Sequence, residues 1–251
     1  MISKQNMELV RSLAHKKGRE ETGLFVAEGE KMVFDLLQTN LALSALYFTA
    51  ECAPLLTAFP HPAKMVQVSA KEMDRLSAFK TPSGILAVFG IPYRETESKS
   101  FAGLSLVLDG VQDPGNLGTI IRLADWFGIK QIFCSENCVD SYNPKCIQST
   151  MGAIARVEVR YLELKKLLEE AVEQNFPVYG TYMEGENLYQ AALATEALVV
   201  MGSEGQGISP GLERFLTKKI SIPAFPAGAH ALESLNVAIS AAIVCAEFRR
   251  R

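Results

Sequence analysis

Five polar side chains between residues 116 and 236 have the chemistry to bind or activate a substrate. Asn116 and Arg122 follow a Pro-Gly turn, Glu204 lies among three glycines, and Ser234 and Asn236 open the last apolar segment. Amides and hydroxyls can orient a substrate, a carboxylate can hold a donor group, and a guanidinium can stabilise negative charge. Each of these residues also suits a helix cap, a tight turn or an exposed surface, so spacing alone does not decide between these roles.

Other active-site patterns are absent or fail on physical grounds. No GxGxxG sequence follows the first strand of either half, and no GK[ST] sequence is present, so dinucleotide and Walker-type sites lack support. Residues 207–211 match the GxSxG pattern of serine hydrolases, but the residue after the serine is Pro210, which has no N–H for an oxyanion. Cys134, Cys138 and Cys146 have neither a CxxC pair nor a nearby histidine, so we expect no metal site.

The composition is that of an ordinary globular chain. Of 251 residues, 48% are hydrophobic and 21% charged, and the formal net charge is −3. These values exclude a disordered chain and a protein held on nucleic acid by bulk positive charge, so any basic surface must be local. The chain starts without a secretion-signal core, and its apolar runs are too short to span a bilayer. The five cysteines lack a disulfide spacing, so we expect a cytoplasmic protein with reduced thiols and no membrane span.

Alternating helix and strand patterns divide the chain into two α/β blocks. Residues 94–100 are polar throughout and form the expected linker between a domain at 1–93 and a domain at 101–251. The first domain is predicted to be a small α/β sandwich with helices, one of them at 51–59, between strands near residues 23–29, 44–49, 64–69 and 84–92. The second is predicted to contain a parallel sheet with strands near residues 104–111, 131–135, 155–160, 176–183, 197–205 and 218–224.

The order of the elements predicts a single site in the second domain. In an open parallel sheet, ligands bind at the edge where the strands have their carboxyl ends. The loops after Val111, Met201 and Ile222 fall at such strand ends, and the polar residues lie in these loops or just beyond them. We therefore expect the three loops to meet.

Three motifs in this order resemble the SpoU family of RNA ribose methyltransferases, part of the SPOUT superfamily. They are N-x-G-x-x-x-R at residues 116–122, G-x-E-G-x-G at 202–207, and I-P with S-L-N-V at 222–223 and 234–237. The resemblance covers the whole second domain. The first domain looks like the ribosomal-protein-type substrate-binding domain that precedes it in many members. The loop at 224–233 is longer than the family pattern, which affects its expected contacts with a cofactor.

The resemblance implies an α/β fold with a deep trefoil knot and a bound S-adenosyl-L-methionine. The implied activity is methyl transfer to the 2′-hydroxyl of a ribose in structured RNA, with rRNA favoured over tRNA. Gly202, Ile222 and Leu235 would contact the cofactor, mainly through backbone groups. The family pairs its catalytic domains, so we expect a homodimer through the last helix. The alternative is a catalytically inactive RNA-binding ribosome-assembly factor on the same fold, which would be expected to have lost Arg122 or Asn236.

The resemblance also suggests a role for each polar residue. Arg122 is the candidate catalytic residue, and because a guanidinium deprotonates only with difficulty, we expect it to stabilise the alkoxide while water takes the proton. Asn116 would orient Arg122 or the ribose. Glu204 would hold Arg122 or donor groups near the cofactor. Ser234 and Asn236 would hydrogen-bond the target nucleotide.

The basic N-terminus would then serve substrate binding. Lys16, Lys17 and Arg19 supply clustered cations for phosphates, and Phe25 supplies an aromatic ring for an unstacked base. Without the family context, the same cluster suits a solvated helix end equally well.

Overall fold

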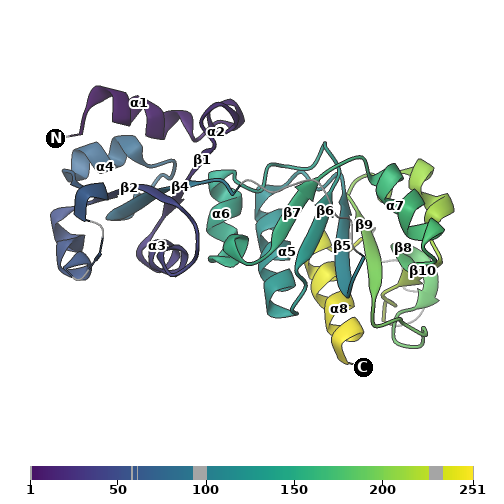
Figure 1. Cartoon of the computed structure of the whole chain (residues 1–251). Coiled ribbons are helices and arrows are strands. Elements are labelled where there is room, and N and C mark those ends of the chain that lie inside the picture. Colours follow the sequence, from purple (N-terminus) through teal and green to yellow (C-terminus); the bar gives the residue numbers. More distant parts are fainter. Residues whose placement is uncertain (1, 58, 61, 93–100, 226–233, 251) are drawn as a thin grey trace. The chain divides into compact units, whose positions relative to one another are not determined.

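The computed structural model describes all residues except 1, 58, 61, 93–100, 226–233 and 251. The chain forms two compact units, one of Met1–Thr96 with Asp140–Ala155 and one of Glu97–Val139 with Arg156–Arg251. Figure 1 shows the elements of both. The expected linker at 94–100 lies outside the described residues. The segment Asp140–Ala155 was expected in the second domain but groups with the N-terminal unit, so the division at 1–93 and 101–251 stays a proposal.

The N-terminal unit is built around a four-stranded sheet in the order β1-β4-β2-β3. Strand β4 is antiparallel to both of its neighbours, whereas β2 and β3 are parallel. Its elements are α1 (Lys4–Ser12), α2 (Lys16–Thr22), β1 (Leu24–Glu28), α3 (Glu30–Leu37), β2 (Leu43–Phe48), the 3-10 helices η1 (Ala50–Leu56) and η2 (Pro62–Lys64), β3 (Met65–Gln67), α4 (Ala70–Leu76), β4 (Ile85–Gly90), α6 (Pro144–Thr150) and η3 (Ala153–Ala155).

Local sequence accounts for most of these elements and for one wrong expectation. Ser3 caps α1, and a reciprocal capping box between Ser69 and Glu72 starts α4. The α-helix expected at 51–59 is instead the 3-10 helix η1, which contains Pro54. A proline inside an α-helix removes a hydrogen bond and crowds the preceding turn, so a short 3-10 segment forms in its place.

The second unit contains a six-stranded sheet in the order β10-β8-β9-β5-β6-β7. All of its strand pairs are parallel, which confirms the expected sheet type. Its elements are β5 (Leu104–Asp109), α5 (Pro114–Trp126), β6 (Gln131–Cys134), β7 (Glu158–Tyr161), α7 (Leu164–Glu173), β8 (Val178–Asn187), β9 (Ala197–Gly202), the 3-10 helix η4 (Pro210–Phe215), β10 (Lys218–Ser221) and α8 (Val237–Arg250).

The core of this unit positions its strand ends. Every residue of the central strand β5 is buried, as expected for a parallel strand covered on both faces. The apolar face of α7 packs on one cluster with β5 and β9, and α5 and α8 pack against each other (Figure 1). Among the described residues, none of the helices is both long and apolar enough to cross a bilayer. The trefoil knot stays a prediction, and most of the expected longer loop at 224–233 lies outside the described residues.

Candidate active site at the carboxyl edge of the parallel sheet

The first loop of the site begins where β5 ends. β5 and β9 run side by side until Asp109 lies opposite Gly202, and the chain then turns into α5. Asp113 is the N-cap of α5, because its side chain accepts a hydrogen bond from the backbone N–H of Asn116 at 2.8 Å. Pro114 takes the first helical position, where its missing N–H costs nothing. Asn116 was expected near the cap, and with Asp113 in that place its side chain faces the other loops.

The side chains of Asn116, Glu204 and Asn236 form one hydrogen-bonded network. Glu204 Oε1 accepts from Asn236 Nδ2 at 2.7 Å and from Asn116 Nδ2 at 3.1 Å. Asn236 Nδ2 also donates to Asn116 Oδ1 at 3.0 Å. Each residue belongs to a different motif, and the hydrogen bonds span 88 and 120 positions of sequence. The structure therefore joins all three segments, as the strand order predicted.

The same network caps the last helix. Asn236 Oδ1 accepts from the backbone N–H groups of Ala238 at 3.0 Å and Ile239 at 3.2 Å. Glu204 Oε1 accepts from the N–H of Val237 at 3.1 Å. Three of the amides that the start of α8 would leave unpaired are thus satisfied by side chains. Asn236 was expected to bind the target nucleotide, and in this structure it is a helix cap and a link to Glu204.

Close backbone packing explains the glycines around Glu204. A Cβ atom on Gly202 would lie 2.0 Å from the carbonyl carbon of Gly207, a distance that no side chain tolerates. Gly207 has a φ of +68°, and its N–H donates to the carbonyl of Ser203 at 2.9 Å. Glycine lets the backbone approach another group closely, and the group that Gly202 approaches is the backbone of its own turn.

A cleft of about 1210 Å³ lies beside this network. It is lined by residues from β8, from the ends of β9 and β10, and from η4 and α8. The three expected cofactor residues, Gly202, Ile222 and Leu235, all line it, as do Glu204 and Ser234. Leu235 is 43% exposed, which leaves an apolar side chain available to a ligand. The cleft exceeds the usual range of ligand pockets, about 300–1,000 Å³, and so has room for more than one small molecule.

One wall of the cleft carries a cluster of Tyr182, Glu213 and Lys219. Lys219 Nζ lies 3.0 Å from Glu213 Oε2 and 4.5 Å from the centre of the Tyr182 ring. The hydrogen bond from Lys219 lowers the pKa of Glu213. Burial, followed by the negative charge of Glu213, raises the pKa of Tyr182 to about 12. The phenol is therefore a neutral donor at physiological pH.

Arg122 stands apart from the network. It lies on an exposed part of α5, and within the described part of the chain its side chain makes no hydrogen bond or ion pair. It does not line the cleft of its own chain. Of the two roles expected for Glu204, holding Arg122 or holding other donor groups, the structure gives only the second.

Sequence reasoning missed the residues that support the first loop. Ser135 Oγ accepts from the N–H of Gly110 at 2.9 Å, and Cys138 Sγ accepts from the N–H of Val111 at 3.3 Å. A hydrogen bond with the Cys134 thiol, helped by Ser135 and these amides, lowers the pKa of Cys138 to about 6 against the effect of burial. These contacts come from a neighbouring strand end, and no sequence pattern marks them. No cluster of three or more His, Cys, Asp or Glu residues suited to a metal occurs among the described residues.

Two of the four residues expected to bind RNA are structural. Arg19 is 3% exposed; its Nη2 donates to Asp140 Oδ2 at 2.6 Å and its Nη1 to the carbonyl of Leu13 at 2.7 Å. Phe25 is fully buried, with its ring centre 4.9 Å from that of Tyr142. Neither can contact a substrate, so the expectation was wrong for both.

The other two remain candidates for RNA contact. Lys16 and Lys17 are exposed, and their only ion pairs in the described chain are with Glu20 and Glu21, each at 3.7 Å on the same helix. Such exposed pairs are weak and open readily to another anion.

Models of known protein families match both parts of the chain. The SpoU rRNA Methylase family matches residues 103–246, and the MRM3-like substrate binding domain matches residues 4–87. Among curated relatives, an uncharacterized tRNA/rRNA methyltransferase of Synechocystis sp. is 30% identical, covering 100% of this chain and 93% of its own. The 23S rRNA (guanosine(2553)-2′-O)-methyltransferase RlmP of Bacillus subtilis is also 30% identical, covering 95% and 94%.

Solved structures agree with these matches. A putative RNA methyltransferase of the TrmH family from Porphyromonas gingivalis is 40% identical, with a TM-score of 0.89 over 100% of this chain and 99% of that one. An AdoMet-bound rRNA methyltransferase from Sinorhizobium meliloti is 26% identical, with a TM-score of 0.83 over 100% and 97%. The fold class and the resemblance drawn from the three motifs are confirmed. The chain belongs to the SpoU rRNA Methylase family.

Proposed function

We propose that this protein transfers a methyl group from S-adenosyl-L-methionine to the 2′-hydroxyl of a ribose in ribosomal RNA. The observation that carries the proposal is the network of Asn116, Glu204 and Asn236, which joins the three family motifs beside a large cleft. The names of the relatives from Bacillus subtilis and Sinorhizobium meliloti support rRNA as the substrate class. The cytoplasmic location expected from the sequence is part of this proposal.

The cleft has the chemistry that S-adenosylmethionine requires. Ile222 and Leu235 supply apolar surface for an adenine ring, and backbone groups near Gly202 supply donors and acceptors for its edge. Glu184 supplies negative charge that suits a sulfonium or ammonium group, whereas the charge of Glu213 is paired with Lys219. When bound, the cofactor supplies an electrophilic methyl group. The protein's own residues then have to hold the ribose and stabilise the charge that develops on its oxygen.

Arg122 is the residue we assign to that charge. Its guanidinium has no partner in the described part of the chain and offers a planar set of N–H donors. Donation to the developing alkoxide would stabilise the transition state, and the hydroxyl proton would leave to water. Ser234, exposed at the cleft, is placed to hydrogen-bond the nucleotide. Asn116, Glu204 and Asn236 act as positioning residues for the loops.

A homodimer would bring Arg122 to a cleft. Trp126, one turn after Arg122 on α5, is 84% exposed, and Ile239 on the adjacent α8 is 55% exposed. α5 and α8 therefore each expose a large apolar side chain, and aromatic residues such as Trp126 are enriched in protein interfaces. We propose that two copies pair through α5 and α8 and that each supplies Arg122 to the site of the other. Trp126→Asp should give a monomer by sedimentation and abolish turnover, whereas a wild-type monomer with full activity would refute the pairing.

The central test is methyl transfer itself. Wild-type protein is incubated with radiolabelled S-adenosylmethionine and deproteinised rRNA, with tRNA as the comparison, and the RNA is then digested with alkali. A 2′-O-methyl group blocks cleavage of the adjacent phosphodiester, so the label should appear in alkali-resistant dinucleotides from rRNA. Label in single nucleotides would indicate base methylation, and cofactor binding without transfer would favour the inactive assembly factor. Either result would overturn the proposal.

A further inference from the structure

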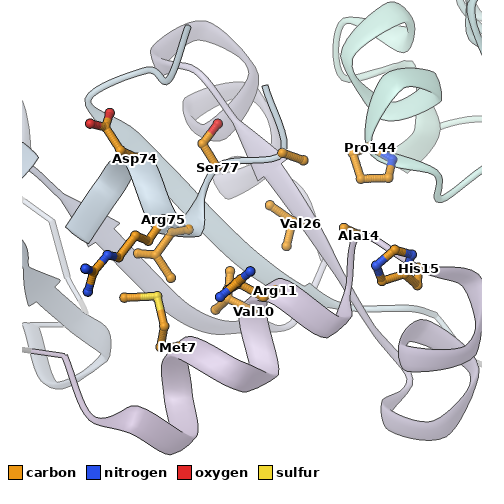
Figure 2. A pocket seen from close by; sticks show the side chains of 12 residues that line it. Met7, Val10, Arg11, Ala14, His15, Val26, Asp74, Arg75, Ser77 and Pro144 are labelled. Atoms are coloured by element: carbon orange, nitrogen blue, oxygen red, sulfur yellow. The ribbon is translucent and has the colours of Figure 1, made fainter. Parts of the chain in front are cut away.

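The N-terminal unit contains a cavity of about 610 Å³ that the proposed chemistry does not use. It lies between α1 and the end of α4, with β1 beneath them (Figure 2). Its apolar surface comes from Met7, Val10, Val26 and Leu76. Of these, Val10, Val26 and Leu76 are buried members of the unit's core, while Met7 is partly exposed at the edge. These core side chains thus form an apolar floor, and the cavity above it opens to solvent.

Three basic side chains surround this floor. Arg11 and His15 come from α1 and the turn after it, and Arg75 comes from α4, while Asp74 is the acidic residue that lines the cavity. Figure 2 shows Arg11 near the centre and His15 toward one end. None of these basic side chains makes a hydrogen bond or ion pair with the residues that the structure describes. The two arginines therefore outnumber the single carboxylate of Asp74, and the charge around the cavity is net positive.

The apolar floor and the basic side chains around it together fit one class of ligand. A flat apolar group would cover the floor, and an anion on either side would meet Arg11 and Arg75. Peptides and lipids offer such groups separately, whereas an unpaired nucleotide carries a planar base between two phosphates. Met7 adds a polarisable thioether, which makes favourable contacts with aromatic rings.

We propose that this cavity binds an unpaired nucleotide of the substrate RNA, with the base against Met7 and Val10 and the flanking phosphates at Arg11 and Arg75. The inference rests on the proposed function, since it takes the substrate to be RNA. It adds Arg11 and Arg75 as candidates for RNA contact beside Lys16 and Lys17, in place of Arg19 and Phe25. Those two residues are buried, whereas Arg11 on α1 and Arg75 on α4 are exposed, as Lys16 and Lys17 on α2 also are.

The test compares two double variants of the full-length protein. Arg11→Ala with Arg75→Ala removes the cations of the cavity. Lys4→Ala with Lys71→Ala removes the same charge from the same two helices, at exposed positions outside the cavity. The probes are fluorescein-labelled oligouridine and oligoadenosine and an RNA duplex of the same length, and binding is followed by anisotropy over a range of salt concentrations.

The arginine variant should bind the single strands about tenfold or more weakly, because charge-assisted hydrogen bonds to two phosphates are lost. Its salt slope should fall by about 1.4, which is about 0.7 for each single-strand phosphate. The lysine variant should differ much less from wild type. Met7→Ala should weaken single-strand binding about fivefold and leave the salt slope unchanged, because it removes apolar contact and no charge. Thermal unfolding checks that every variant is folded.

Three results would overturn the proposal. Equal losses in the arginine and lysine variants would mean diffuse charge attraction, and equal losses for duplex and single strand would mean recognition of a helical backbone. No binding of single strands by wild type would assign the cavity to a ligand other than RNA. Cofactor binding by calorimetry and methyl transfer to rRNA are measured on the same samples. Failure of those two assays refutes the proposed function, whereas only the oligonucleotide results can refute nucleotide binding in the cavity.

Discussion

Asn236 makes two kinds of contact that substitution can separate. Its Oδ1 caps α8 by accepting from the N–H groups of Ala238 and Ile239, and its Nδ2 donates to Asn116 and Glu204. Asn236→Ser keeps an oxygen that can cap the helix, because serine is nearly as good a cap as asparagine. It loses the Nδ2 amide, and a hydroxyl that caps the helix cannot also donate to both Asn116 and Glu204, since it has a single O–H. Asn236→Ala loses both.

The expected losses of stability follow from these contacts. Both Nδ2 hydrogen bonds are in an exposed part of the site, where water replaces a lost partner, so together they contribute about 1 kcal/mol. The cap contributes about 1 kcal/mol more. At about 2–4 °C for each kcal/mol, Asn236→Ser should lower Tm by about 3 °C and Asn236→Ala by about 6 °C.

Turnover should follow a different order. Both variants remove the hydrogen bonds from Asn236 Nδ2 to Asn116 and Glu204, although Asn116 still donates to Glu204. A small misplacement of a positioned group can reduce rate by up to about 100-fold. We expect both to lose about 10- to 100-fold in methyl transfer to rRNA, with little difference between them. Asn143, which caps α6 through the N–H of Lys145 at 2.9 Å, provides the matched control. Asn143→Ala should lose similar stability and keep its turnover at saturating RNA.

One result would refute a role for the Nδ2 donor of Asn236 in turnover. If Asn236→Ser kept full turnover and only Asn236→Ala lost it, activity would follow the helix cap. The Nδ2 donor would then have no part in the site, and the motif would be structural. Measuring Tm by calorimetry and turnover on the same preparations separates the two interpretations.

Three further predictions concern other parts of the molecule. Arg122→Ala should keep its Tm and cofactor affinity but lose about 100-fold or more in turnover, with partial recovery in Arg122→Lys; full activity in the alanine variant would contradict our assignment. Gly202→Ala should unfold at a lower temperature and lose cofactor affinity, since its Cβ would overlap the backbone of Gly207. Unchanged cofactor binding by calorimetry would contradict this prediction. Burial raises the pKa of Glu28 despite hydrogen bonds from Ser77 and Ser83, so the folded state holds more protons and stability should fall as pH rises above about 4.5. In Glu28→Gln that part of the denaturation profile should be absent, and an unchanged profile would exclude Glu28 as its cause.

The sequence predicted the parts of the site that follow from chain topology. A parallel sheet has the carboxyl ends of its strands at one edge, so motifs after β5, β9 and β10 had to meet once the strands were recognised. Asn116, Glu204 and Asn236 were therefore correctly grouped. Their actual partners depend on side-chain geometry over distances of 88 and 120 residues, which no local pattern encodes.

The errors have a common physical cause. A charged or aromatic residue was taken as accessible because its type is usually exposed or functional, yet accessibility depends on a partner elsewhere in the chain. Arg19 is buried because Asp140, 121 residues later, neutralises it, and Phe25 because Tyr142 packs on its ring. The cap of α5 could have been recognised from the sequence. Asp113 stands directly before a proline at the start of a helix, and this is a local signal for a cap.

The capping of α8 bears on how the site can stabilise charge. The start of a helix normally offers unpaired N–H groups and a positive dipole end to an anion. Here Glu204 and Asn236 already accept from the amides of Val237, Ala238 and Ile239, and the carboxylate adds a negative charge at that end. The start of α8 is therefore a poor place for a phosphate or an alkoxide. This favours our proposal that a guanidinium supplied from α5, and not the amides at the start of α8, stabilises the developing charge.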